Sequence, residues 1–162
     1  MDDRALGETL VAILSDLIRL PSPYPPGETA AICRYAADRL RRAGYRTDVI
    51  VKTAGVDNVV ASIGTGAPHL VFNAHADTVA VGDRSMWRTD PLAPAVADGK
   101  VFGLGAGNCK GSMAVQLWLA EAIAAAGGPT RGTVTFTFVG DEENLGPDGM
   151  AHLRASGKVK PD

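Results

Sequence analysis

The 162-residue chain has few cysteines and no long hydrophobic run. Its two cysteines, Cys33 and Cys109, form neither a disulfide framework nor the closely spaced pairs of zinc ribbons and redox motifs. The most apolar segment, 113–126, contains Gln116 and Glu121 and is shorter than the roughly 20 residues that cross a bilayer. These absences argue against a disulfide-stapled domain and against a membrane partner.

Positive charge is also scarce, since 16 Lys and Arg stand against 18 Asp and Glu, for a net charge of −2. A chain without a basic stretch is not expected to bind nucleic acid. Arg39, Arg41 and Arg42 are close together near the end of a predicted helix, where we expect a solvated basic face. The N-terminus is acidic and its apolar patch at 11–14 is too short for a secretory signal, which predicts a cytoplasmic protein.

Hydrophobic spacing predicts helices interleaved with short strands. The length suits one domain, and the alternation predicts an α/β layered sheet. The segment 110–126 is apolar on nearly all sides, so we expect this helix to lie between the sheet and another layer. The other expected elements are helices at 6–18, at 32–43 and around His152, strands at 45–51, 58–63, 69–72 and 133–139, and loops at 21–27 and 78–91.

Candidate ligands follow predicted strands in three places, where open α/β sheets form their sites. The first is His75-Ala76-Asp77: imidazole is a common zinc ligand, and Asp77 is spaced to orient it or to join the ligands. Alone, such a histidine is more often a structural hydrogen-bonding group.

The second place is the glycine-rich run 103–111, which opens the helix at 110–126. It lacks the Gly-Lys-Ser/Thr of a Walker A loop, because Lys110 is followed by Gly111, and Asn108 stands where a dinucleotide-binding loop has its third glycine. We therefore reject both nucleotide-binding interpretations.

The third place is Asp141-Glu142-Glu143. Adjacent carboxylates repel one another, so the run is either exposed to water in a loop or compensated by a divalent cation. In the second case one glutamate would bind the metal while its neighbour acts as general base.

In order and spacing these clusters resemble the co-catalytic zinc peptidase family that includes aminoacylase, acetylornithine deacetylase, succinyl-diaminopimelate desuccinylase and glutamate carboxypeptidase. The resemblance extends over the whole chain and includes the proline-rich stretch 21–27, the first ligand strand 69–78, Trp87 with Asp90-Pro91, and the stretch 98–103 before the glycine-rich turn. It implies a three-layer α/β/α catalytic domain with a mixed sheet. Residues 1–162 would be the N-terminal part of that domain, apparently truncated, without the lid and dimerisation domain and the C-terminal part.

The resemblance also implies roles for individual residues. His75 would bind the first zinc ion with support from Asp77, Glu143 would bind the second, and Glu142 would be the general base. Up to two zinc ions are expected, with cobalt or manganese as substitutes. The implied activity is hydrolysis of amide bonds in peptides or N-acyl amino acids, with a homodimer expected for a full-length form.

Two departures limit this transfer. The family has a bridging aspartate where this chain has Asn108, which predicts a weakened or single-metal site unless Cys109 or another anion compensates. Leu104 also replaces an arginine often found in the glycine turn. The family's later ligands would lie beyond residue 162, since His152 is expected to be a surface residue and not one of these ligands. The alternatives are a non-catalytic binding or regulatory module on the same scaffold, or a chain that folds poorly alone.

Overall fold

The computed structural model describes residues 2–160 and contains a four-stranded main sheet in the order β2-β3-β8-β4. Its strands are β2 (Arg46–Val51), β3 (Asp57–Thr65), β8 (Gly132–Val139) and β4 (His69–His75). β3 pairs antiparallel with both β2 and β8, whereas β4 runs parallel to β8. The sheet is therefore mixed, as expected, and the parallel pair brings two carboxyl ends to one edge.

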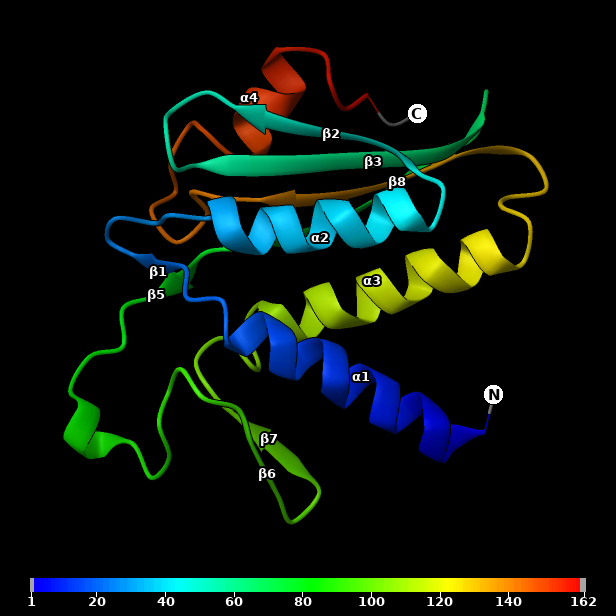
Figure 1. Ribbon diagram of the computed structural model, residues 1–162. Helices are drawn as coiled ribbons and strands as arrows, with labels where there is room; N and C mark the ends of the chain where they lie inside the picture. Colours follow the sequence, from blue (N-terminus) through cyan, green and yellow to red (C-terminus); the bar gives the residue numbers. More distant parts are fainter. Residues whose placement is uncertain (1, 161–162) are drawn as a thin grey trace.

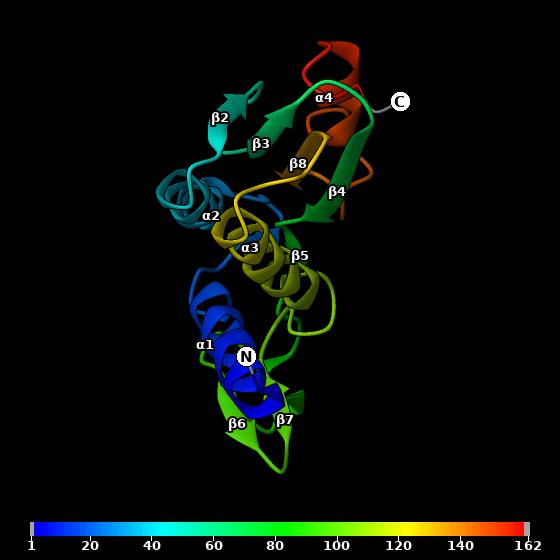
Figure 2. The ribbon, with the colours of Figure 1, turned by 90° about the vertical axis from the view of Figure 1, so that its right-hand side faces the viewer.

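Helices cover both faces of this sheet (Figures 1 and 2). On one face lie α2 (Ala30–Arg42) and α3 (Lys110–Ala125), and α1 (Asp3–Ile18) packs against α3 on the side away from the sheet. The helix α4 (Met150–Ala155) lies on the opposite face. The expected three-layer arrangement and the buried position of the third helix are both confirmed. None of the described helices is long and apolar enough to cross a membrane.

Aromatic side chains fill the core between the sheet and the helices α2 and α3. The ring of Phe136 is fully buried; it stacks on Phe72 with ring centroids 5.1 Å apart and meets Tyr45 edge-on at 5.9 Å. These are the offset and edge-to-face geometries that aromatic pairs prefer. A smaller apolar cluster lies under α4, where Leu153 packs with Val60, Val139 and Val159. In β8, threonines alternate with Val134, Phe136 and Phe138, so these three apolar side chains share the face toward α2 and α3, whereas Val139 lies on the face toward α4.

Two pairs of short strands lie outside the main sheet. β1 (Pro23–Tyr24) pairs parallel with β5 (Thr78–Val79), and β6 (Ala95–Ala97) forms a hairpin with β7 (Lys100–Phe102). The segments 21–27 and 78–91 were expected to be loops throughout, so the strands β1 and β5 correct that prediction. A short 3₁₀ helix, Arg84–Met86, lies in the second segment. The pairing of β1 with β5 holds the proline-rich stretch next to the end of β4.

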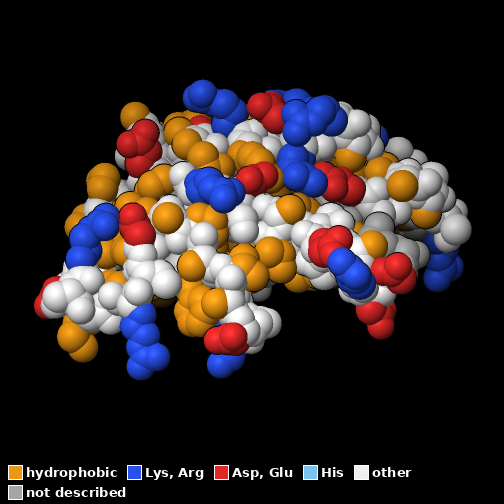
Figure 3. Space-filling view, turned by 60° about the horizontal axis from the view of Figure 1, so that its bottom comes forward, with side chains coloured by type: hydrophobic (Ala, Val, Ile, Leu, Met, Phe, Trp, Pro, Cys, Tyr) orange, Lys and Arg blue, Asp and Glu red, His pale blue; other side chains and the backbone are white. Residues whose placement is uncertain are grey.

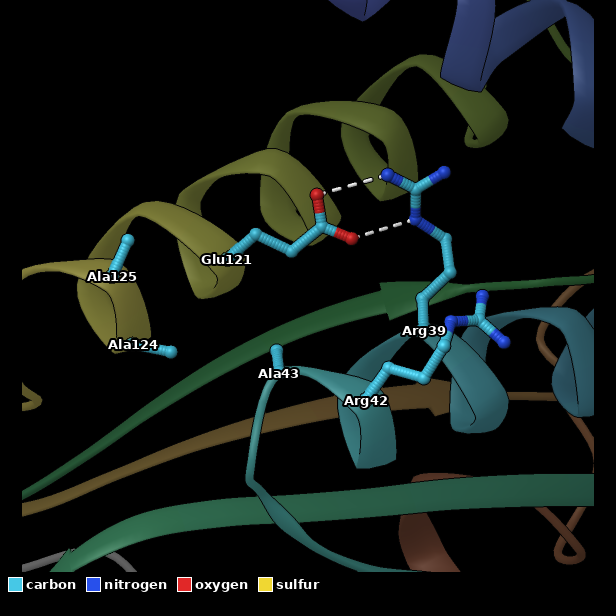
Figure 4. Close-up of a pocket in the computed structure, with 6 residues that line it drawn as sticks. All are labelled: Arg39, Arg42, Ala43, Glu121, Ala124 and Ala125. Carbon is cyan, nitrogen blue, oxygen red and sulfur yellow. Dashed lines mark hydrogen bonds and ion pairs between the residues drawn. The ribbon is translucent and has the colours of Figure 1, made fainter.

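The basic residues at the end of α2 are not all solvated, which corrects the expectation of a simple basic face. Arg39 makes two hydrogen bonds to Glu121 of α3, at 2.8 and 2.9 Å, and the two side chains are only 21% and 32% exposed (Figure 4). It also donates to the Tyr35 hydroxyl at 3.0 Å. Acidic and basic side chains are interspersed on the face shown in Figure 3. Arg39 therefore helps to join α2 to α3, whereas Arg41 pairs with Asp38 of its own helix.

Candidate metal centre

The parallel pairing of β4 and β8 decides where the site lies. His75 is the last residue of β4 and stands in register with Val139, the last residue of β8. The sequence had placed His75 beyond its strand, but the ladder continues through it. Because Glu142 and Glu143 follow β8 closely, the histidine and the acidic run meet at one edge of the sheet.

The His75 ring is held with its two nitrogens in different surroundings. Nδ1 lies 2.9 Å from the backbone oxygen of Asp77 and 3.4 Å from its carboxylate Oδ1. Nε2 lies 3.2 Å from Oδ1 of Asn108 and 3.7 Å from Oε2 of Glu142. A hydrogen bond at Nδ1 fixes the tautomer that leaves Nε2 available as a ligand atom.

His75, Glu142 and Glu143 form a compact group of potential metal ligands. Each of these three residues offers one potential ligand atom, and the three atoms all lie within 4.8 Å of one another. His75 is buried, Glu143 is half-buried and Glu142 is exposed. The structure therefore brings together the five residues that the sequence singled out, since Asp77 and Asn108 both contact the same imidazole.

The electrostatic surroundings of His75 favour a positive charge. Burial by itself lowers the pKa of the imidazole, but hydrogen bonds to Asp77, Cys109 and Asn108 outweigh it and raise the pKa to about 11. For the Cys109 thiol, burial raises the pKa, but hydrogen bonds to His75 and Ser112 lower it by more, so the net shift of this pKa is downward. Imidazole binds a metal only in its neutral form, so an ion at Nε2 would have to displace this proton.

Asp77 connects the histidine to the acidic run. Its side chain is fully buried; Oδ2 accepts a hydrogen bond from the backbone N–H of Glu143 at 2.9 Å, and Oδ1 accepts no hydrogen bond within the described chain. Asp77 is thus placed to orient the imidazole and the backbone of Glu143 together.

The glycine-rich turn approaches the site closely because it lacks side chains. Gly105 has a φ of +80°, and a Cβ at this position would lie 2.8 Å from Thr78 and 3.1 Å from the side chain of Lys110. Only glycine fits such a backbone without strain. The turn delivers Asn108 to the imidazole and starts α3 two residues later.

Two polar residues near the site are buried, and the sequence did not predict this burial. Lys110 is 1% exposed and donates from Nζ to the backbone oxygen of Leu20 at 2.9 Å. Asn58, on β3, is fully buried. A lysine opening an otherwise apolar helix was a visible signal, whereas nothing in the local pattern distinguishes Asn58. His152 lies on α4, as expected, and is not a member of the ligand group.

Two hollows differ in their relation to this centre. One of about 240 Å³ lies beside the acidic run, where Asp141 and Glu142 contribute to its wall. A larger one of about 550 Å³ lies between α2 and α3, lined by Arg39, Arg42, Ala43, Glu121, Ala124 and Ala125 (Figure 4). It is an open groove whose Arg39 and Glu121 neutralise each other, and it contains none of the ligand group.

Residues 71–162, more than half of the chain, match the model of peptidase family M20/M25/M40. The chain belongs to this family. It is 36% identical over 152 residues to a succinyl-diaminopimelate desuccinylase of Methylocella silvestris, covering 91% of this chain and 39% of that protein. It is 41% identical over 146 residues to one of Xanthobacter autotrophicus, covering 88% and 38%.

Solved structures share the fold. Human carnosine dipeptidase 1 matches with a TM-score of 0.80 at 24% identity, covering 96% of this chain and 36% of that one. An M20 family metallo-carboxypeptidase from Sulfolobus solfataricus matches with a TM-score of 0.81 at 21% identity, covering 100% and 36%. The chain therefore spans little more than a third of the proteins it resembles.

Proposed function

We propose that this chain is the N-terminal part of the catalytic domain of a metal-dependent hydrolase that cleaves amide bonds in peptides or N-acyl amino acids. The observation that carries the proposal is that His75 Nε2 and the two glutamate carboxylates converge at the ends of β4 and β8, where Asn108 Oδ1 of the glycine-rich turn meets them. Membership of a peptidase family and relatives named as desuccinylases support this class of reaction.

The residues take different roles in this proposal. His75 and Glu143 hold the metal, with Asn108 as a neutral oxygen donor, and Asp77 orients the imidazole through its Nδ1. Glu142 is exposed at the mouth of the site, where it can accept a proton from the attacking water. A divalent ion bound here supplies Lewis acidity toward that water and the amide carbonyl.

The donor set fits one metal ion better than two. A catalytic zinc ion takes about three protein ligands, and one imidazole, one carboxylate and one amide oxygen meet that need. Two dications would repel each other across Asn108, because an amide oxygen contributes no negative charge. We therefore expect one zinc ion, replaceable by cobalt or manganese, with the substrate-binding and dimer-forming parts supplied by a longer polypeptide.

Zinc titration of the purified chain tests the metal site directly. We expect one zinc ion per chain, a loss of binding of about tenfold or more in His75→Ala and Glu143→Gln, and unchanged binding in His152→Ala, which removes a histidine outside the group. A folded chain with negligible zinc affinity would support the alternative, a non-catalytic module on this scaffold. Activity is tested in a longer form that includes the missing segments: no metal-stimulated cleavage of any N-acyl amino acid or dipeptide would refute the proposed reaction.

A further inference from the structure

The segment 140–149, hereafter the acidic loop, carries Glu142 and Glu143 between β8 and α4. Its two ends touch, because a Cβ on Gly149 would collide with the backbone oxygen of Gly140. The loop has turns but no regular secondary structure, so side-chain contacts must determine where its glutamates point.

Asp141 fills the interior of the acidic loop. Its Oδ2 accepts the backbone N–H of Asp148 at 2.9 Å, and its Oδ1 accepts from the Asn144 amide at 3.1 Å. Gly146 packs so closely on this carboxylate that a Cβ would overlap it, and its N–H donates to the Asp141 backbone oxygen at 2.9 Å. Asp141 itself has a φ of +66°, which aspartate adopts more readily than most residues.

The Asn58 side chain hydrogen-bonds both ends of the same loop to the sheet. Its Oδ1 accepts the N–H of Gly140 at 3.1 Å, and its Nδ2 donates to the backbone oxygens of Asp148 at 2.9 Å and Ile50 at 3.2 Å. Lys52 of the neighbouring segment adds an ion pair to the Asp148 carboxylate at 2.5 Å. Both ends of the loop are therefore fixed, and Asp141 holds the part between them.

A backbone hydrogen bond joins the fixed loop to the candidate metal centre. The N–H of Glu143 donates to Asp77 Oδ2, and the other oxygen of that carboxylate lies near His75 Nδ1. If the loop loosened at Asp141, this hydrogen bond would break. The Glu143 carboxylate would then no longer be held in place relative to the imidazole.

We propose that Asp141 is a positioning residue, whose carboxylate holds the acidic loop so that Glu142 and Glu143 face His75. The inference rests on the proposed function in taking Glu143 as a metal ligand. Asp141 acts through the loop backbone, so geometry and not its negative charge is what the site requires.

Three variants separate these effects. Asp141→Ala removes the loop contacts, whereas Asp141→Asn removes only the charge, since its amide can still accept from Asp148 N–H, pair with Asn144 and adopt a positive φ. Asp98→Ala is the matched control, because Asp98 is an exposed aspartate at a φ of +51° in the turn between β6 and β7. We expect zinc affinity to fall by about tenfold in Asp141→Ala and to stay within about twofold in the other two.

Amide hydrogen exchange of the metal-free chain gives a second readout that needs no zinc. The N–H groups of Glu143 and Asp148 should exchange about tenfold faster in Asp141→Ala, with no change in Asp141→Asn or Asp98→Ala. If Asp141→Ala does not fold, Asp141→Gly removes the carboxylate while tolerating the positive φ.

The outcomes distinguish this inference from the proposed function. Equal losses in Asp141→Ala and Asp141→Asn, or unchanged zinc affinity in Asp141→Ala with wild-type binding intact, would overturn the positioning role. Wild-type protein without zinc affinity would overturn the proposed function, and faster exchange confined to Asp141→Ala would then still show that Asp141 holds the loop.

Discussion

Lys110 offers a quantitative test of how the glycine-rich turn is packed. Its ammonium group is buried at the start of α3 and has a backbone oxygen, that of Leu20, as its hydrogen-bond acceptor. Burial in these surroundings lowers the pKa of the lysine from 10.5 to about 8. The informative change is Lys110→Met, which keeps an unbranched side chain of similar length and removes the titrating group.

The magnitude follows from the pKa difference between the folded and unfolded chains. A shift from 10.5 to about 8 is roughly 2.5 pH units, which corresponds to about 3 kcal/mol at about 1.4 kcal/mol per unit. Between these pH values the unfolded chain holds the proton and the folded chain has released it, so stability rises with pH. Below pH 8 both states are protonated and the full cost of burying the charge is present.

At pH 7 two effects of the substitution oppose each other. Methionine removes the burial cost of the charge, but it deprives the Leu20 oxygen of its donor, which costs about 1–3 kcal/mol. The net change at pH 7 is therefore small, and the pH dependence is the discriminating quantity. The unfolding free energy of wild type minus that of Lys110→Met should rise by about 3 kcal/mol between pH 7.5 and about 10.5.

Urea unfolding at several pH values, followed by tryptophan fluorescence, measures this difference. Subtracting the variant removes the titrations that the two proteins share. Lys100→Met is the control, because Lys100 is exposed on β7 and its removal should leave the pH dependence unchanged. A difference that is flat or falls across this range would refute the burial of a charged lysine at this position.

Two further predictions concern Asn108 and Glu121. Asn108→Asp should increase the zinc stoichiometry or affinity measured by elemental analysis, because it adds an anion 3.2 Å from His75 Nε2; no change would indicate a different metal arrangement. Glu121→Gln should lower the unfolding free energy by about 1 kcal/mol, because it removes one charge-assisted bond to Arg39 in a partly buried pair. The same change at the exposed Glu8 should cost under about 0.5 kcal/mol, and equal losses would contradict the helix-joining role of Glu121.

Local patterns predicted the regular elements where hydrophobic spacing was strong. The helices at 6–18 and 32–43 and the strand at 133–139 were all found within a few residues of their predicted bounds. The strand predicted at 69–72 was too short, since β4 continues to His75. Asn73 interrupts its apolar pattern, but the residue is paired in register with β8 and its side chain bonds to Thr137 at 2.8 Å. Strand pairing, a long-range property, overrode the local signal.

The sequence by itself determined which chemical groups are present and, through their spacing and family resemblance, which kind of site they form. His75, Asp77, Asn108, Glu142 and Glu143 were all named from residue type and order. Only the tertiary structure decided that these groups meet, because the parallel pairing of β4 with β8 places their carboxyl ends side by side. It also assigned Asn58 and Lys110 to the support of the site, through contacts between residues 82 to 90 positions apart, which no local pattern encodes.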